Sequence, residues 1–529
     1  MNVWEVVDRE PFMDVMPVTW AYKIKRFPSG LVRKLKARLC VRGDLEIENV
    51  HFWETFAPVV NWNTVRLLLV LSAQLGLETL QVDYTAAFVH AEVDKPPGHE
   101  KMSPEEQCRS SQFAEMPRGF AEQGKALRLR KNLYGKKSAP RLWFQHLKSK
   151  LESKECGFKQ MTDVDPCLFI SEKVICLVYV DDTLLHARTR ADIDEVINIL
   201  RGTHDVTLEA EDSVAGFLGV HIDRDARTGE VHLTQKGLID RIVDALHVED
   251  LPSVDTPATT CLGKDPHGDP PNCDFNYASV QGMLACLDRH SRPDISFAVS
   301  QTARFTFAPK RSHELAMIRI GQCLKGTRDQ GLILKPMTST SFKMDAYVDS
   351  DFLGLYGQER REDPDNVRSR AGYVILVNGC PITWKSKLID GICLSTMMAE
   401  YYALSMAMRE VLPLRELVRT VATGLGIEEK VQTLFKTTIW EDNMGCLTLA
   451  NLEPGQSTPR SKFYDSKVHW FRAHLSSPKG QSDNPADRNY QPNGMWVVKI
   501  DTKIQLADVF TKPLPKDVFV PLRKLLMGW

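Results

Sequence analysis

The sequence lacks several features that would assign it to a specialised class of proteins. Its 12 cysteines are spread over 529 residues, with no C-x-x-C pair and no Cys/His group at zinc-ligand spacing. Its longest apolar runs, residues 65–71 and 174–180, are far shorter than the roughly 20 residues that span a bilayer. These absences exclude a disulfide scaffold, a zinc module and a transmembrane helix.

The N-terminus also lacks the order of a secretory signal. MNVWEVVDREPFM is acidic and mixed, whereas a signal peptide has a basic region followed by an apolar one. Sparse cysteines are typical of compartments that keep thiols reduced. We therefore expect a soluble protein that is not secreted and that works in the cytoplasm, the nucleus or both.

The chain has almost no net charge, but its charges are segregated. It contains 67 Lys and Arg against 68 Asp and Glu, so it lacks the basic excess of a typical nucleic-acid binder. Residues 20–42 nevertheless carry eight basic residues and residues 125–150 carry nine, and neither window contains an acid. We predict that these two basic windows follow a phosphate backbone.

The first half of the chain predicts a helix, an insertion and a linker. A helix is expected over 61–75, where an Asn caps an apolar segment that ends at a Gly. Residues 92–117 are polar and contain Pro, so they predict a surface insertion. Residues 250–275 are rich in Pro, Gly and Asp and are the best linker candidate.

Three acids of the first half stand at the ends of predicted strands. A short strand over 80–82 leads to Asp83, and a β-branched strand over 174–180 leads to Asp181 and Asp182. Asp tolerates the left-handed conformation of a tight turn, so we expect a hairpin with both acids at its tip. Alone, an Asp pair is ordinary turn chemistry, whereas three clustered carboxylates suit two magnesium ions about 4 Å apart.

The second half predicts a mixed sheet with helices. Strands are expected over 342–348, 372–377, 382–385, 437–440 and 495–500, with a turn at Asn378-Gly379. A helix should start near Ser395 and be kinked or broken at Pro413, and a further helix should end the chain. Strands that are followed by alternating strands and helices favour a sheet with both parallel and antiparallel pairs.

Several sequence motifs in the first 334 residues resemble motifs of one protein family. They are KARLCVRG (36–43), FWETFAPVVNWNTVRLLL (52–69), VDYTAAF (82–88), NLYGKKSAPRLW (132–143), YVDD (179–182), FLGVHI (217–222), YASVQGMLACL (277–287), RPDISFAVSQTARF (292–305) and LKGTRDQGLIL (324–334). In this order they resemble the reverse transcriptase of copia-type long-terminal-repeat retrotransposons.

The resemblance implies a role for each matching residue. Asp83, Asp181 and Asp182 would ligate the catalytic Mg²⁺ pair, and Phe88 would exclude a ribose 2′-hydroxyl from the incoming nucleotide. The other implied substrate contacts are Lys36 and Arg38 to the triphosphate, Gly135 and Pro140 beneath the template and nucleotide, and Phe217, Leu218 and Gly219 at the primer terminus. Taken singly, the aromatic residue would be an ordinary core residue and the cations ordinary surface charges.

A second set of acids occurs in the last 190 residues. Asp349, Glu400, Asp442 and Asp508 follow the order strand, helix, strand end and late helix, in which a ribonuclease H fold gathers four carboxylates around two metals. YVDSDF (347–352), LSTMMAEYYALS (394–405), WEDN (440–443) and QLADVFTKPLP (505–515) resemble the copia-type ribonuclease H. Three features depart from this family. Met398 stands where the family usually has an acid, Phe463 stands where it usually has a His, and residues 476–493 form an insertion.

The resemblance implies a fold class and a division into domains. The expected class is α+β and α/β multidomain, with a right-hand polymerase of fingers, palm and thumb, a connection region and a ribonuclease H-like mixed-sheet domain. Its parts are 1–225 for fingers and palm, 226–341 for thumb and connection, and 342–529 for ribonuclease H. No zinc knuckle, protease motif or integrase motif is present, so the chain resembles the C-terminal portion of a Pol polyprotein, with Met1 read as an internal methionine.

The implied function is an RNA-directed and DNA-directed DNA polymerase with ribonuclease H activity that copies retrotransposon RNA into DNA. Its partners would be an RNA template, a DNA primer, an RNA–DNA hybrid and dNTPs, and no membrane. Each active site would take two Mg²⁺, with Mn²⁺ as the substitute ion, and the protein would work in a cytoplasmic virus-like particle, in the nucleus or in both. The alternatives are a catalytically inactive remnant that binds nucleic acid at most, and a metal nuclease without polymerase activity.

Overall fold

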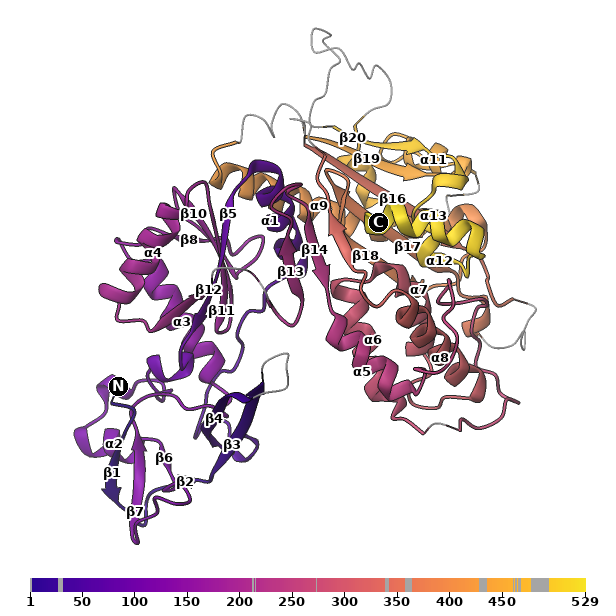
Figure 1. Cartoon of the computed structure of the whole chain (residues 1–529). Helices are drawn as coiled ribbons and strands as arrows, with labels where there is room; N and C mark the ends of the chain where they lie inside the picture. The colour runs from indigo at the N-terminus through magenta and orange to yellow at the C-terminus, as the bar shows by residue number, and fades with distance from the viewer. Residues whose placement is uncertain are drawn as a thin grey trace. The chain divides into compact units, whose positions relative to one another are not determined.

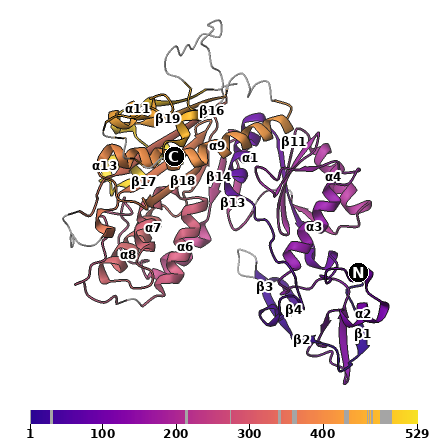
Figure 2. The same cartoon turned by 180° about the vertical axis from the view of Figure 1, so that it is seen from behind.

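The computed structural model describes residues 2–26, 32–211, 214, 216–272, 274–337, 342–356, 364–427, 435–459, 461, 464, 468–476 and 494–529. Its contacts divide the chain into two compact units (Figures 1 and 2). Unit 1 contains Met1–Asn61 and Thr79–Asp212, and unit 2 contains Trp62–Glu78 and Ser213–Trp529. We describe each unit separately.

Unit 1 is built on a six-stranded sheet. Its strand order is β12-β5-β11-β10-β9-β8, with the bounds β5 (Glu78–Tyr84), β8 (Lys159–Gln160), β9 (Leu168–Ile170), β10 (Val174–Tyr179), β11 (Asp182–Ala187) and β12 (Leu208–Glu211). Helices α3 (Ala139–Leu151) and α4 (Arg190–Gly202) contribute apolar residues to the same core as these strands. The four apolar residues that α4 buries recur at helical spacing, namely Ile193, Val196, Ile197 and Leu200.

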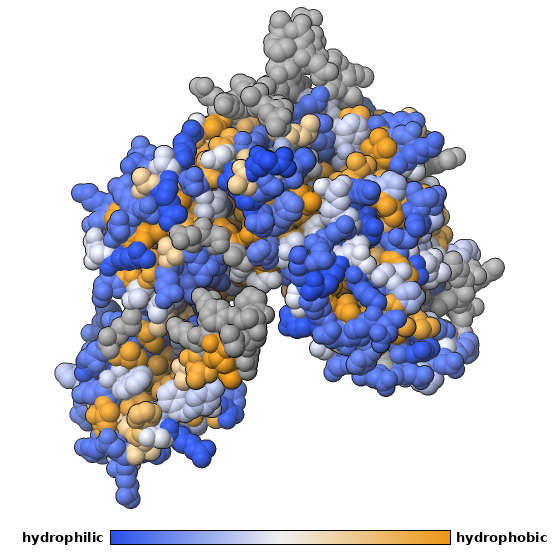
Figure 3. Space-filling view, in the orientation of Figure 1, coloured by the Kyte–Doolittle hydropathy of each residue, from blue (hydrophilic) through white to orange (hydrophobic). Residues whose placement is uncertain are grey.

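The rest of unit 1 forms a small sheet and a separate hairpin. The small sheet has the order β1-β7-β6-β2, with β1 (Trp4–Asp8), β2 (Val15–Met16), β6 (Phe113–Ala114) and β7 (Lys125–Leu129). The hairpin pairs β3 (Val18–Arg26) with β4 (Val32–Val41), and its residues Ile24 and Leu35 are exposed. Figure 3 shows apolar residues at the surface of this unit. Short helices complete the unit, namely η1 (Gly43–Leu45), η2 (Ala87–His90), η3 (His99–Lys101) and α2 (Pro104–Arg109).

The expectation of a surface insertion over 92–117 is wrong for its last residues. Phe113 and Ala114 form β6 and are buried between β7 and β2. Their burial supplies part of the apolar core of the small sheet. The polar composition of the segment concealed this two-residue strand, because strands this short give no periodic pattern.

Unit 2 begins with helix α1 (Trp62–Leu75), as predicted from its sequence. This helix packs against strand β18 (Cys380–Leu388), more than 300 residues away in the chain. A small sheet has the order β13-β14-β15, with β13 (His221–Arg224), β14 (Val231–Thr234) and β15 (Leu332–Leu334). A helical cluster follows, formed by α5 (Lys236–Leu246), α6 (Tyr277–His290), η4 (Pro293–Ile295), α7 (Ser296–Ala303) and α8 (Arg311–Gly326).

The second sheet of unit 2 has five strands in the order β18-β17-β16-β19-β20. Strands β16 (Lys343–Asp351), β17 (Arg370–Val377) and β18 are antiparallel, whereas β19 (Lys436–Glu441) and β20 (Met495–Lys499) join in parallel. Helix α9 (Thr396–Gly424) packs on β16 and β17 (Figure 2). The remaining helices are η5 (Pro364–Val367), α11 (Met444–Ala450), η7 (Trp470–His474), η8 (Thr502–Ile504), α12 (Asp508–Thr511) and α13 (Lys516–Met527).

The predicted fold class, an α+β and α/β multidomain protein, is confirmed by these mixed sheets and helices. The two-residue turn at Asn378-Gly379 is confirmed as well, since both residues take a positive φ. Pro413 does not break α9, which continues for 29 residues around it. None of the helices in the described part of the chain combines the length and apolar character that a membrane crossing requires.

Candidate active sites

The three aspartates of the first half lie together in unit 1. Asp83 is in β5, Asp182 begins β11, and Asp181 is in the turn between β10 and β11. Strands β5 and β11 are neighbours in the sheet, and the amide of Tyr84 donates to the carbonyl of Asp181 at 2.9 Å. The hairpin thus brings Asp181 and Asp182 beside Asp83, about 100 residues earlier in the chain.

Burial and like charge shift the acidity of this group. Burial raises the pKa of Asp182, a hydrogen bond lowers it, and the neighbouring charges of Asp181 and Asp83 raise it, so that the pKa is about 6. The donor of that bond is Gln81 Nε2, 3.2 Å from Asp182 Oδ1. Sequence reasoning missed Gln81, although its position two residues before Asp83 places both on one face of β5.

The turn that carries Asp181 differs from the prediction in its conformation. The hairpin is present, with Tyr179 paired to Asp182, but the residue with a positive φ is Val180, at 51°, and neither aspartate. A β-branched residue in this region is strained. The strain is held by packing, because Val180 contacts the core and its carbonyl accepts a 2.5 Å hydrogen bond from Trp143 Nε1.

Two of the predicted substrate-binding residues of unit 1, Arg38 and Phe88, contact the same tyrosine. Arg38 lies over the ring of Tyr134 at 5.1 Å, and the rings of Phe88 and Tyr134 are 5.0 Å apart. Burial raises the pKa of Tyr134, the Arg38 charge lowers it, and the charges of Asp181 and Asp83 raise it further. Tyr134 therefore links the cation and the aromatic residue to the aspartates, a role that sequence reasoning missed.

Gly135 is required by its surroundings. Its φ is 91°, and a Cβ at this position would lie 2.1 Å from the carbonyl oxygen of Val41, at the end of β4. Lys36 and Arg38 lie on one face of this strand, since they are two residues apart. Pro140 occupies the first turn of α3, where its missing N–H is tolerated.

The predicted primer turn lies in unit 2. Leu218 and Gly219 both take a positive φ, and Phe217 pairs with Val220 across the turn. The side chain of Phe217 is completely buried and anchors the turn. Leu218 and Gly219 instead line a cavity of about 690 Å³, together with Lys236 and Arg241 of helix α5.

The carboxylates of the second half gather at one edge of the five-stranded sheet. Tyr347 of β16 is opposite Trp440 of β19 in a parallel pair, so Asp349 and Asp442, each two residues further on, lie side by side. Helix α9 adds Glu400 to them. Oxygen atoms of these three acids lie within 4.8 Å of one another, close enough to hold a metal ion.

The residues present fit a divalent cation. Within the described part of the chain, Glu400 Oε2 is buried without a hydrogen-bond partner, which a bound cation would supply. Burial and the charges of Glu441 and Asp349 hold the pKa of Glu400 well above its usual range, and burial raises that of Asp349 to about 7. Such shifts are expected of carboxylates that are clustered and buried.

Asp508 lies outside the three-acid group and is held by a lysine. It begins helix α12, and its Oδ1 accepts an ion pair from Lys512 Nζ at 2.9 Å. The same ammonium lies 3.2 Å from Asp349, and the hydroxyl of Thr511 also donates to Asp349. Sequence reasoning missed Lys512, although its spacing of four from Asp508 is a helical one.

Glu441 is a fifth acid that sequence reasoning missed. It ends β19, is fully buried, and accepts a 2.9 Å hydrogen bond from the amide of Asn443. Burial raises its pKa to about 8, and its other carboxylate oxygen has no partner in the part of the chain that the structure describes. A string such as WEDN does not show which of two adjacent acids points inward.

Of the departures from the family, the structure describes Met398. Met398 is buried near the start of α9, where its amide donates to the Ser395 hydroxyl that caps the helix. Phe463 and most of the insertion over 476–493 lie outside the described residues. His469 is described, and its Nδ1 lies 3.1 Å from the hydroxyl of Tyr401, one residue after Glu400.

The second basic window is partly neutralised in three dimensions. At least six of its nine basic residues form ion pairs with acids that lie outside the window, namely Lys125, Arg128, Arg130, Lys136, Arg141 and Lys148. The pair between Lys136 and Glu46 is completely buried. Burying such a charge requires a partner, so this cation stabilises the fold and does not contact a ligand.

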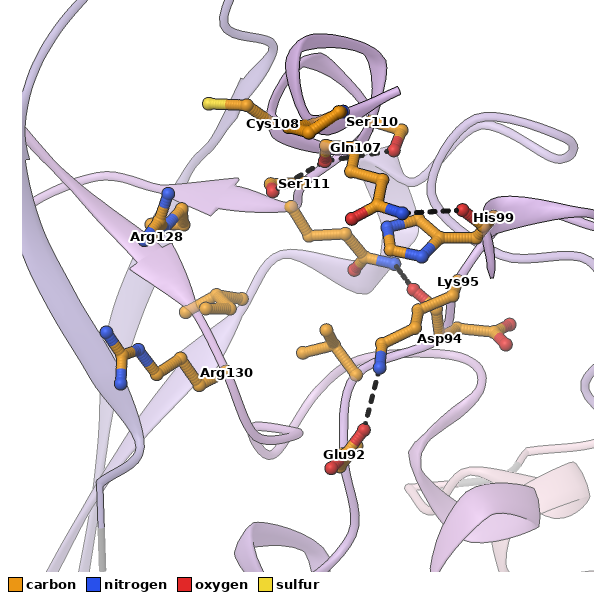
Figure 4. A pocket seen from close by; sticks show the side chains of 14 residues that line it. Glu92, Asp94, Lys95, His99, Gln107, Cys108, Ser110, Ser111, Arg128 and Arg130 are labelled. Carbon is orange, nitrogen blue, oxygen red and sulfur yellow. Dashed lines mark hydrogen bonds and ion pairs between the residues drawn. The ribbon is translucent and has the colours of Figure 1, made fainter. Parts of the chain in front are cut away.

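A polar pocket of about 450 Å³ lies in unit 1, between strand β7 and the 92–112 segment (Figure 4). Its cations are engaged within the protein, Lys95 with Glu92 and both Arg128 and Arg130 with Glu5. None of the predicted site residues is among those that line it. The pocket therefore contains none of the residues predicted to bind metal or substrate.

Comparison with known proteins identifies the class of the first half. Residues 1–260 match the sequence model of a family described as reverse transcriptase (RNA-dependent DNA polymerase). This part of the chain therefore matches a reverse transcriptase domain, and the predicted resemblance to copia-type Pol polyproteins is confirmed. Reverse transcriptases generally use divalent metals, in agreement with the carboxylate clusters.

Two similar proteins extend the likeness over the whole chain. The Retrovirus-related Pol polyprotein from transposon TNT 1-94 of Nicotiana tabacum is 28% identical over 96% of this chain and 35% of its own length. That from transposon RE1 of Arabidopsis thaliana is 27% identical over 98% of this chain and 32% of its own length. The chain thus spans about a third of these relatives.

Among solved structures, two foamy viral protease-reverse transcriptases are similar. One is in complex with double-stranded DNA, with a TM-score of 0.47 and 12% identity over 94% of this chain and 67% of that one. The other is in complex with an RNA/DNA hybrid, with a TM-score of 0.43 and 13% identity over 96% of this chain and 53% of that one. The fold assignment rests on the sheet topology described above.

Proposed function

We propose that this protein is an RNA-directed and DNA-directed DNA polymerase with a ribonuclease that cleaves the RNA strand of a hybrid, and that it copies retrotransposon RNA into DNA. The observation that carries the polymerase is the hairpin that brings Asp181 and Asp182 beside Asp83, within a segment that matches a reverse-transcriptase family. Its partners would be an RNA template, a DNA primer, their hybrid and dNTPs.

At the polymerase site, Asp83, Asp181 and Asp182 would hold two Mg²⁺ ions. Bound there, the ions would activate the primer 3′-hydroxyl and stabilise the leaving pyrophosphate. Gln81 orients Asp182 through its amide hydrogen bond. Arg38, fixed over Tyr134, would contact the triphosphate with Lys36, since a preorganised cation stabilises charge developing there.

The neighbouring residues would shape the nucleotide pocket. Phe88 is held by Tyr134 and would exclude a 2′-hydroxyl by steric contact. Gly135 and Pro140 would lie beneath the template and the nucleotide. Leu218 and Gly219 would contact the primer terminus, with Phe217 as the buried anchor of their turn.

At the ribonuclease site, Asp349, Glu400 and Asp442 would hold the first ion, and Asp508 would complete the second. The support is their convergence to within 4.8 Å from elements far apart in sequence. Within the described residues, Glu400 Oε2 is buried without a hydrogen-bond partner, and this also supports a bound cation there. We propose the same division into domains, with 1–225 as fingers and palm, 226–341 as thumb and connection, and 342–529 as ribonuclease H.

A primer-extension assay on poly(rA)/oligo(dT) tests the polymerase. We expect Mg²⁺-dependent extension that is abolished by Asp181→Asn and by Asp182→Asn, because an amide cannot replace an ionised ligand. Asp163→Asn is the matched control, since Asp163 is an exposed aspartate of the same unit. Extension that survives both ligand substitutions would contradict the metal assignment.

The same preparations distinguish the two alternatives. A folded protein that neither extends a primer nor cleaves a hybrid would be an inactive remnant. In that case Met398 would be the result of mutational drift. Hybrid cleavage without extension would indicate a metal nuclease only. We favour retained chemistry, because all seven predicted ligands are present.

A further inference from the structure

The ribonuclease centre already contains a cation of its own. Lys512 Nζ lies 2.9 Å from Asp508 Oδ1 and 3.2 Å from both Asp349 oxygens. The two carboxylates are buried, with 8% and 2% of their side chains exposed, whereas Lys512 reaches them from a position that is 34% exposed. One ammonium therefore bridges two carboxylates that belong to separate elements, β16 and α12.

The charges that face Lys512 come from several elements. Glu400 of α9, Asp442 after β19 and the buried Glu441 all act on the same group of acids. The three acids that converge to within 4.8 Å include Asp349 but not Asp508. The acids thus form two subsites that share Asp349, one open to a divalent ion and the other filled by an ammonium.

An ammonium and a divalent ion cannot occupy the same position between two carboxylates. Mg²⁺ binds carboxylate oxygens at about 2.0–2.1 Å in an octahedral shell, and a lysine ammonium between Asp349 and Asp508 excludes it from that position. Each carboxylate oxygen has two lone pairs, so Asp349 can still contribute to the open subsite. The subsite between Asp349 and Asp508 can accept an ion only after Lys512 has moved away. The partly exposed position of Lys512 gives its flexible stem room to do so.

We propose that Lys512 is a positioning residue that occupies the second cation subsite of the ribonuclease centre until an ion displaces it. It holds Asp508 beside Asp349 while the first subsite, formed by Asp349, Glu400 and Asp442, binds an ion. The two ions therefore bind with unequal affinity. This inference rests on the proposed ribonuclease function.

Counting bound Mn²⁺ by electron paramagnetic resonance tests the proposal on the full chain. All variants carry Asp83→Asn, Asp181→Asn and Asp182→Asn, so that the polymerase site does not contribute. We expect one tight and one weak Mn²⁺ per chain with Lys512 present, and Lys512→Met to tighten the weak one by about tenfold or more. Lys516→Met is the control, since Lys516 pairs with Asp255 and is 71% exposed.

A second variant tests whether Lys512 competes with the ion for the subsite or only stabilises the fold. Lys512→Arg keeps the charge and can bridge both carboxylates with its fork, so the second Mn²⁺ should bind as weakly as before or more weakly. Thermal unfolding gives an independent readout. Without metal, Lys512→Met should lower the melting temperature, and saturating Mn²⁺ should restore it, because the ion replaces the lost counter-charge.

The outcomes separate this inference from the function on which it rests. Unchanged Mn²⁺ affinities in Lys512→Met, with melting lowered equally with and without Mn²⁺, would overturn the inference and leave the ribonuclease centre in place. Absence of Mn²⁺ binding in all variants would overturn the ribonuclease proposal and the inference with it.

Discussion

The indole Nε1 of Trp143 donates a 2.5 Å hydrogen bond to the carbonyl of Val180, so helix α3 holds the turn that carries Asp181. Trp143 is completely buried, and its ring also packs against Tyr84, the residue after Asp83. One side chain thus contacts both the turn that carries Asp181 and the strand that carries Asp83. Through this contact, the 132–143 segment positions the 179–182 turn.

Replacing Trp143 with Phe should impair the polymerase more than the fold. The variant keeps an aromatic ring but loses the bond to the strained turn, so we expect the free energy of unfolding to fall by about 1–2 kcal/mol. Extension should slow because Asp181 is then less well positioned. Denaturant unfolding and primer extension measure the two effects, with Trp4→Phe, on partly exposed strand β1, as the control. Equal extension rates in both variants would show that the turn needs no anchor.

Asp182 should make stability depend on pH in the absence of metal. The folded protein keeps this proton up to a pKa of about 6, whereas an unfolded Asp loses it near pH 4. Unfolding therefore releases a proton between these values, and stability falls as the pH rises from about 4 to 6. Asp182→Asn should remove this part of the pH dependence, and Asp163→Asn should not. Denaturant titrations at half-unit pH intervals measure it, and identical profiles would contradict the burial of Asp182.

Arg66 should be essential for the stability of unit 2. It is buried in α1 and donates to the carbonyls of Ile382 and Arg289 at 2.7 and 2.9 Å, and its guanidinium lies 4.2 Å from the ring centre of Trp384. Burial lowers its pKa to about 9, against the nearby charge of Asp288. Removing it leaves buried carbonyls without donors.

We therefore expect Arg66→Met to lower the free energy of unfolding by about 3 kcal/mol or more. Arg66→Lys should recover only part of this, because an ammonium lacks the planar fork. Arg227→Met, on the surface of the same unit, is the control. Chemical denaturation of unit 2, followed by tryptophan fluorescence, gives the comparison. A loss below about 1 kcal/mol would mean that Arg66 contributes no more than a surface residue.

Template–primer binding should weaken steeply with salt, and the two basic windows should contribute unequally. A log–log slope of several units is expected if the windows contact phosphates. Lys23 is exposed on the β3–β4 hairpin, whereas Arg128 is paired with Glu5. Lys23→Gln should therefore reduce the slope by about one unit and Arg128→Gln by much less. Fluorescence anisotropy across a salt series measures both, and a flat response would refute the placement of the windows.

Local sequence patterns predicted the structure correctly where neighbouring residues in the chain decide the conformation. The helix that ends before Gly76, the turn at Asn378-Gly379 and the strand that leads to Tyr179 were all predicted, because capping, positive φ and β-branched runs act over a few residues. The order of the motifs identified the family without any contact information. The sequence also indicated the seven acids, because each lies at or near one end of a recognisable strand or helix.

Other features depend on contacts between distant segments. The 125–150 window has no acid in sequence, yet Glu5, Asp8 and Glu46 neutralise several of its cations, because folding brings together residues about 90 to 125 positions apart. The strain fell on Val180 and not on Asp181, since the bond from Trp143 and the core packing override local preference.

The sequence by itself determined the family, the fold class and the candidate acids, because those depend on residue types in a fixed order. Only the tertiary structure decided what surrounds them. It placed Tyr134 between Arg38 and Phe88, Glu441 beside Glu400, and Lys512 between Asp349 and Asp508. The physical reason is that charge and burial act through space, so a residue's chemistry follows from its neighbours in the fold and not from its neighbours in the chain.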